Sequence, residues 1–164
     1  MQTPADNIRG PVASINQGTT VGTSSTVDGT GASWQDEGFI RAVIQFGTVS
    51  AGGATAWLEV SDDDVTYVAL DTDLGLTANT LDASWANADD NVVRVIEVDT
   101  QMLDADKTYV RVSVANGDGT TPSEAAAYME FHSIKNTQFK DRTAADVGLY
   151  LDGGQTITVT ASTV

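Results

Sequence analysis

Apolar side chains alternate with polar ones between positions 39 and 70, and this pattern constrains the fold more than any other feature. FIRAVIQF (39–46) and ATAWLEVS (54–61) each place an apolar residue at every second position, and VTYVAL (65–70) follows. Period-two patterning is typical of strands with one buried face and one wet face. AGGA and SDDD separate the runs as turns, because glycine accepts positive φ and aspartate hydrogen-bonds its own backbone. The stretch predicts three strands and is interpreted as a β-meander.

Five further stretches carry strand patterns, at 19–27, 91–98, 108–115, 123–134 and 155–161, and no comparable helical run is present. Eight short strands separated by turns indicate an antiparallel sandwich or barrel. Eight strands suit a jelly roll, in which two sheets share one core. The predicted fold class is all-β: an antiparallel eight-stranded β-sandwich of jelly-roll type, with long loops and little helix.

The chain length of 164 residues suits one domain with a full core. Residues 1–18 contain two prolines and little periodicity, which predicts an N-terminal arm. Residues 19–164 are expected to form a single β-sandwich domain. Within it, 135–154 is a polar extension before the last strand, 155–161.

The stretch 71–91 is the longest without a strand pattern. Loops of more than about 12–15 residues are uncommon unless they have a function or a local fold. Leu74, Leu76, Leu81 and Trp85 are expected to hold this loop against the sheet, with room for one helical turn. The alternative is an exposed loop that contacts a partner.

The chain carries 23 acidic and 8 basic residues, a formal net charge of −15. Such a surface repels phosphate backbones and anionic lipids, so nucleic acid and membranes are not expected partners. Solubility, a cationic partner or bound calcium are the readings that remain open. The N-terminus lacks a signal-peptide pattern, and no apolar run approaches the roughly 20 residues that span a bilayer. Synthesis in the cytoplasm is therefore expected.

No catalytic constellation is recognised in the sequence. Cysteine is absent, which excludes disulfides, thiolate zinc sites and cysteine nucleophiles. The single histidine, His132, lies in a strand pattern, and no G-x-S-x-G nucleophile elbow is present. The acidic residues concentrate in turns, where aspartate already satisfies the backbone. We therefore expect no enzyme, no catalytic residues and no cofactor.

Calcium is the one metal considered, because clustered aspartate oxygens in a loop are its natural ligands. The candidates are Asp62, Asp63 and Asp64, with Asn116 and Asp118. No run matches the EF-hand loop, and neighbouring aspartates also cap hairpins. These residues are weak candidates, and no metal site is predicted.

Three tryptophans are candidates for interaction. Trp57 lies on the polar face of its strand, whereas Trp34 and Trp85 lie in loops. Each ring could cover an open end of the sandwich, anchor a protein contact or stack on a sugar. Ile8 and Val12 join this set, because an extended arm can add to a sheet edge.

The succession TVDGTG, GTVSAGG, ATAWLEVSDDDVTYVAL and VDTQMLDADKTYVRVSV resembles the jelly-roll decoration, or cement, proteins of tailed bacteriophages. The resemblance covers residues 19–134, and such relatives often have glycine at the turn position of Asp64. It implies a virion structural protein that binds the outer capsid surface and bridges capsomers, with the major capsid protein as partner and a homotrimer as its assembly. A carbohydrate-binding β-sandwich module and a phage head-fibre or tail domain are the alternatives.

Overall fold

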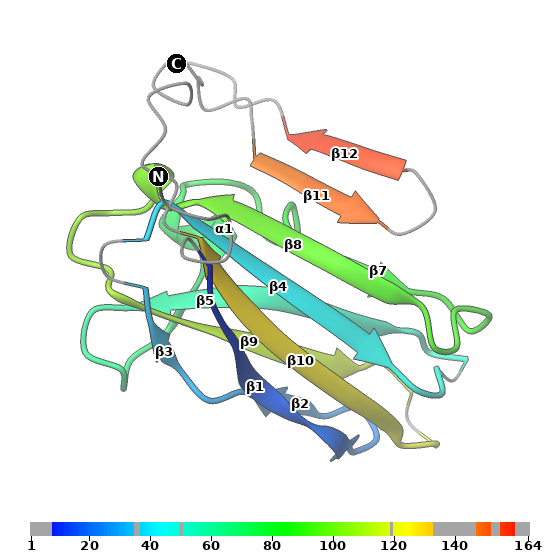
Figure 1. Cartoon of the computed structure of the whole chain (residues 1–164). Helices are drawn as coiled ribbons and strands as arrows, with labels where there is room; N and C mark the ends of the chain where they lie inside the picture. The colour runs from blue at the N-terminus through cyan, green and yellow to red at the C-terminus, as the bar shows by residue number, and fades with distance from the viewer. Residues whose placement is uncertain are drawn as a thin grey trace.

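The computed structural model describes residues 8–34, 37–49, 51–118, 120–132, 147–151 and 155–159. They form two antiparallel sheets that face each other (Figure 1). The strands are β1 (Ile8–Val21), β2 (Thr26–Asp28), β3 (Ala32–Ser33), β4 (Phe39–Phe46), β5 (Ala54–Ser61), β6 (Val68–Ala69), β7 (Ala83–Trp85), β8 (Val93–Asp99), β9 (Tyr109–Asn116), β10 (Ser123–His132), β11 (Val147–Leu151) and β12 (Gln155–Val159). A helical turn, α1 (Leu70–Asp73), and a 3-10 turn over Thr100–Met102 complete the described elements. Within these residues no helix is long and apolar enough to cross a membrane.

The strand order is that of a jelly roll. The first sheet has the order β1-β10-β4-β8-β11-β12, and the second has the order β2-β9-β5-β6, with β3 beside β9 and β7 beside β5. Between β1 and β10 the chain changes sheet at each connection, except among the short pieces β2–β3 and along β5–β6–β7. Pairing of β1 with β10 brings the start and the end of this body together. The predicted all-β sandwich is confirmed.

The core lies between the two sheets and is formed by the predicted inward faces. Buried and half-buried residues alternate along all of β4, and the same alternation runs through most of β5 and β10. The ring of Phe46 meets that of Trp85 edge-on, with centroids 4.9 Å apart. Leu81 and Trp85 are buried, and Leu74 and Leu76 pack against the core. The prediction that the 71–91 loop is held against the sheet is therefore confirmed.

The predicted β-meander is wrong. β4 and β5 lie in different sheets: β4 pairs with β10 and β8, whereas β5 pairs with β9, β6 and β7. The apolar faces of β4 and β5 instead meet across the core. A period-two pattern shows which face of a strand is buried and carries no information about its hydrogen-bonding partner.

The predicted N-terminal arm is wrong for residues 8–18, because β1 is a full sheet strand paired with β10. Its register shifts between Arg9 and Val12, between Ala13 and Ile15, and between Ile15 and Thr19. The first two shifts each insert one extra residue, which moves the following side chains to the other face, and the third inserts two. The alternation is thus interrupted in the sequence, although Ile15 is buried in the core.

The polar extension contains a strand that sequence patterning did not predict. β11 pairs with β8, opposing Leu149 to Ile96, and β12 pairs with β11 (Figure 1). β12 (Gln155–Val159) corresponds to the predicted last strand, 155–161, of which residues 160–161 lie outside the described residues. The remainder of the 135–154 extension lies outside the described residues.

Candidate functional site

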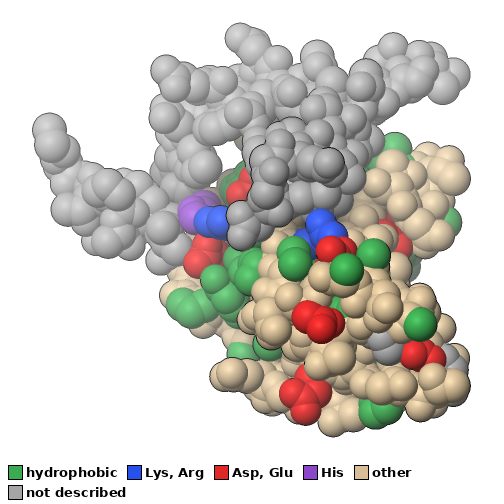
Figure 2. Space-filling model, turned by 90° about the vertical axis from the view of Figure 1, so that its right-hand side faces the viewer, with side chains coloured by type: hydrophobic (Ala, Val, Ile, Leu, Met, Phe, Trp, Pro, Cys, Tyr) green, Lys and Arg blue, Asp and Glu red, His purple; other side chains and the backbone are tan. Residues whose placement is uncertain are grey.

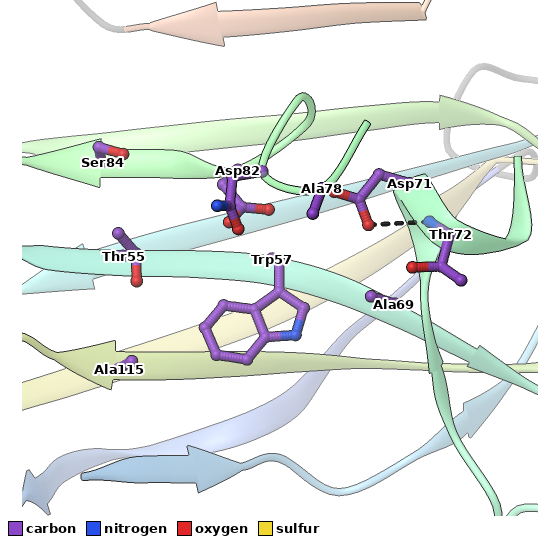
Figure 3. A pocket seen from close by; sticks show the side chains of 10 residues that line it. Thr55, Trp57, Ala69, Asp71, Thr72, Ala78, Asp82, Ser84 and Ala115 are labelled. Atoms are coloured by element: carbon purple, nitrogen blue, oxygen red, sulfur yellow. Dashed lines mark hydrogen bonds between the residues drawn. The ribbon is translucent and has the colours of Figure 1, made fainter. Parts of the chain in front are cut away.

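A groove of about 640 Å³ lies on the outer face of the second sheet (Figure 3). Its floor comes from outward-facing positions of β5 and β9, namely Thr55, Trp57 and Ala115. Its wall comes from α1 and from the loop that leads to β7. β6 and β7 both pair with β5, so the chain between them must leave the edge of β5 and return to it. That return places the wall over the floor.

Two carboxylates line this groove. Asp71, in the first turn of α1, is 5% exposed, and its Oδ1 accepts a hydrogen bond of 2.9 Å from the Thr72 amide. Asp82 is half-buried just before β7. Burial, and then the charge of Asp71, raise the pKa of Asp82 from 3.8 to about 6. The groove therefore brings two carboxylates together where they are partly shielded from solvent.

Trp57 has the largest side chain that lines the groove (Figure 3). Its ring nitrogen is already hydrogen-bonded within the protein. Its Nε1 donates to Glu59 Oε1 at 3.1 Å. Glu59 Oε2 accepts from Arg111 Nε at 2.6 Å, and the same arginine pairs with Asp28 at 3.0 Å. This network fixes the orientation of the indole, so the ring face is the part of Trp57 that a ligand can contact.

The other interaction candidates lie elsewhere. Trp85 is 2% exposed, and its Nε1 donates to the Val92 carbonyl at 2.8 Å, so its side chain is part of the core and not a surface anchor. Trp34 and Val12 are partly buried and pack against the core. The backbone of Ile8, in β1, pairs with that of His132 in β10, and the Ile8 side chain lies outside the described residues. Of the five candidates, Trp57 is the one that lines this groove.

No protein-family model matches the chain, and a search of curated proteins finds no match. Comparison with solved structures finds a similar chain in the structure of infectious bursal disease virus, Gx strain. The two chains are 16% identical with a TM-score of 0.39, and the match covers 73% of this chain and 30% of that chain. A likeness at this level establishes neither a family nor a function.

In the acidic turn considered for calcium, the carboxylate of Asp63 is hydrogen-bonded to backbone amides of the same turn. Asp63 Oδ1 accepts hydrogen bonds from the Thr66 amide at 2.6 Å and the Val65 amide at 2.9 Å. These bonds, with one from the Ser61 hydroxyl, lower the pKa of Asp63 from 3.8 to about 2. Asp64 accepts from the Tyr67 hydroxyl and has φ of 59°, a conformation that glycine adopts freely.

The other calcium candidates also close a turn. Asn116 Oδ1 accepts from the Asp118 amide at 3.0 Å, and Asp118 Oδ1 accepts from the Thr120 amide at 2.7 Å. Among the residues that the structure describes, no three His, Cys, Asp or Glu side chains converge in a metal-binding group. Acidic side chains are dispersed over the face seen in Figure 2 and do not gather in one patch.

His132 ends β10 on the outer face of the first sheet. Its ring lies edge-on to Phe39 at 6.2 Å, and its Nε2 is 3.7 Å from Glu130 Oε2. The neighbouring Arg41 pairs with Glu130 at 3.7 Å and with Glu97 at 3.5 Å. Burial raises the pKa of Glu97, and Arg41 partly offsets this effect. The histidine is thus one member of a charged cluster across three neighbouring strands.

The groove combines an indole face, two carboxylates and the polar side chains of Asn79, Thr55 and Ser84. This set can hold a cationic group, through the ring and the carboxylates, or a hydroxylated one, through hydrogen bonds. Sequence patterns do not single out Asp71 or Asp82. The one local signal is that Asp71 directly follows an apolar strand pattern. Nothing in the sequence shows that Asp82 lies close to Asp71.

Proposed function

We propose that this chain is a non-enzymatic virion structural protein that decorates the outside of a tailed-phage capsid and bridges neighbouring capsomers. The observation that carries the proposal is the jelly-roll topology of β1 to β10, a fold used by viral capsid domains and by lectins. The resemblance of residues 19–134 to decoration proteins favours the first of these uses.

The charge of the chain supports binding to another protein. A formal charge of −15 makes a surface that is attracted to basic patches and repelled by nucleic acid. A homotrimer on a repeating lattice would make several modest contacts at once. Avidity then produces tight binding to the shell without one strong site.

A carbohydrate-binding module is the alternative from another class, and it predicts aromatic side chains aligned on one face. In the described residues Trp85 lies in the core and Trp34 packs against it, so the two do not join Trp57 in such a row. A single indole in a groove is compatible with sugar binding. It does not favour sugar over protein.

The test is co-sedimentation of the purified protein with shells assembled from a tailed-phage major capsid protein. We expect saturable binding and shells that dissociate at higher temperature, with light scattering giving three times the 17.2 kDa chain mass for the free protein. The control is the same shells with bovine albumin. Failure to co-sediment at low ionic strength, together with binding on a glycan array that Trp57→Ala abolishes, would support the sugar module instead.

An N-terminal truncation is not a suitable docking test, because residues 8–18 belong to β1 and their removal would disrupt the first sheet. Surface positions separate docking from folding better. Val65 is 80% exposed at the tip of the turn after β5, and Tyr128 is 38% exposed on β10. Val65→Asp and Tyr128→Ala should leave thermal unfolding unchanged, and loss of shell binding in either would locate the docking face.

A further inference from the structure

Three arginines in the described part of the chain share one arrangement, in which the guanidinium lies over an aromatic ring and also pairs with a carboxylate. The sets are Arg9 with Phe131 and Glu37, Arg94 with Trp85 and Asp89, and Arg111 with Tyr67 and Glu59. The distances to the ring centroids are 4.4, 5.3 and 4.1 Å, and those to the carboxylates are 3.3, 2.8 and 2.6 Å. A planar guanidinium can stack on a ring while its N–H groups bind an anion.

The groove at Trp57 offers the same two components without the arginine. Asp71 and Asp82 line the groove together with Trp57, and both lie above its ring in the view of Figure 3. Neither carboxylate forms an ion pair with any residue that the structure describes, and no described cation lies over this indole. The negative charges therefore face each other and the groove without a counter-charge.

We propose that the groove binds an arginine side chain of a partner protein, with the guanidinium against the Trp57 ring and paired with Asp71 and Asp82. Charge complementarity decides between ligand classes here. A guanidinium offsets the mutual repulsion of the two carboxylates, whereas a neutral sugar leaves that repulsion in place. The identity of the partner as a capsid protein rests on the proposed function, but binding of the side chain does not.

The burial of Asp71 adds weight to this assignment. It is 5% exposed, and the one hydrogen bond described for its carboxylate comes from the amide of the next residue. A nearly buried carboxylate with one protein donor can accept further hydrogen bonds from an incoming group. A guanidinium supplies several N–H donors in one plane and can bridge both aspartates at once.

The experiment is an NMR titration of the full ¹⁵N-labelled chain with acetyl-Gly-Arg-Gly-amide. The matched ligand is the same peptide with citrulline, which keeps the shape and removes the charge. We expect saturable shifts at the amides of Trp57, Thr72 and Ser84, with at least tenfold tighter binding of the arginine peptide. Equal binding of the two peptides would overturn the proposal.

The matched variants are Asp82→Asn in the groove and Asp62→Asn in the exposed turn after β5, which remove the same formal charge. Asp82→Asn should weaken the arginine peptide about tenfold, and Asp62→Asn should leave it unchanged. Trp57→Leu is the second groove variant, and weaker binding is expected there too. Equal effects of Asp82→Asn and Asp62→Asn would show a non-specific charge effect and refute the site. Peptide binding without shell binding would leave the groove assignment standing and overturn the capsid role alone.

Discussion

Replacing Ser14 with alanine removes a hydroxyl that links β1 of one sheet to β9 of the other. Ser14 is 5% exposed, and its Oγ accepts a hydrogen bond of 3.0 Å from the Val112 amide and donates one of 3.1 Å to the Thr30 carbonyl. β2 pairs with β9 up to Ser113, and β3 pairs with it again at Val110. The hydroxyl therefore fills a gap in the ladder, where the Val112 amide has no strand partner on that side.

The expected cost follows from the two groups that lose a partner. Val112 is fully buried, and leaving its N–H unsatisfied should cost about 2 kcal/mol, within the usual range of about 1–3 kcal/mol. Thr30 is exposed, so water can replace the hydroxyl at its carbonyl at little cost. A loss of about 2 kcal/mol lowers the melting temperature by roughly 4–8 °C in a domain of this size.

Urea unfolding followed by tryptophan fluorescence measures this cost. With a slope of about 2 kcal/mol/M, the midpoint should fall by about 1 M while the slope stays constant. The control is Ser25→Ala, because Ser25 is exposed and its hydroxyl bonds only within a turn, to the Thr23 carbonyl at 3.0 Å. Its midpoint should move by less than a quarter as much. A Ser14→Ala variant as stable as the parent would refute the stabilising role assigned to this hydroxyl.

Three further outcomes are expected. Phe46→Ala should lower the free energy of unfolding in urea by about 4 kcal/mol, because its ring is fully buried. Val65→Ala, at an 80% exposed position, should lower it by less than about 0.5 kcal/mol. Similar losses in the two variants would contradict the assignment of Phe46 to the core. Gly52→Ala should lower the melting temperature, since an added Cβ would lie 2.5 Å from Asp118 Cα; an unchanged melting temperature would show that the turn relaxes freely. The pKa of Asp82 is raised from 3.8 to about 6, so the folded state holds this proton more tightly than the unfolded state and loses stability as pH rises through that interval. The free energy of unfolding of Asp82→Asn should therefore exceed that of the parent by about 1 kcal/mol at pH 7.5 and by nothing at pH 3.5. The figure is discounted for solvent screening because the group is half-exposed. An equal gain at both pH values would show that titration of Asp82 is not its cause.

The alternation of apolar and polar residues was enough to predict which faces of the strands are buried. Along β4 and β10 the burial of alternate side chains was predictable because strand geometry turns successive residues to opposite faces, a property of a few neighbouring residues. The all-β class followed from the same local pattern, and the attachment of the 71–91 loop followed from its length and its apolar side chains. The period-two rule fails along β1, where bulges shift the register and hide a 14-residue strand.

The pairing of strands and the meeting of distant side chains could be read only from the folded structure. β4 and β5 are neighbours in sequence and lie in opposite sheets. The candidate site shows the same limit, since Trp57, Asp71 and Asp82 come together only because β6 and β7 both return to β5. Burial pattern is encoded locally, whereas pairing depends on the packing of the whole chain around one core.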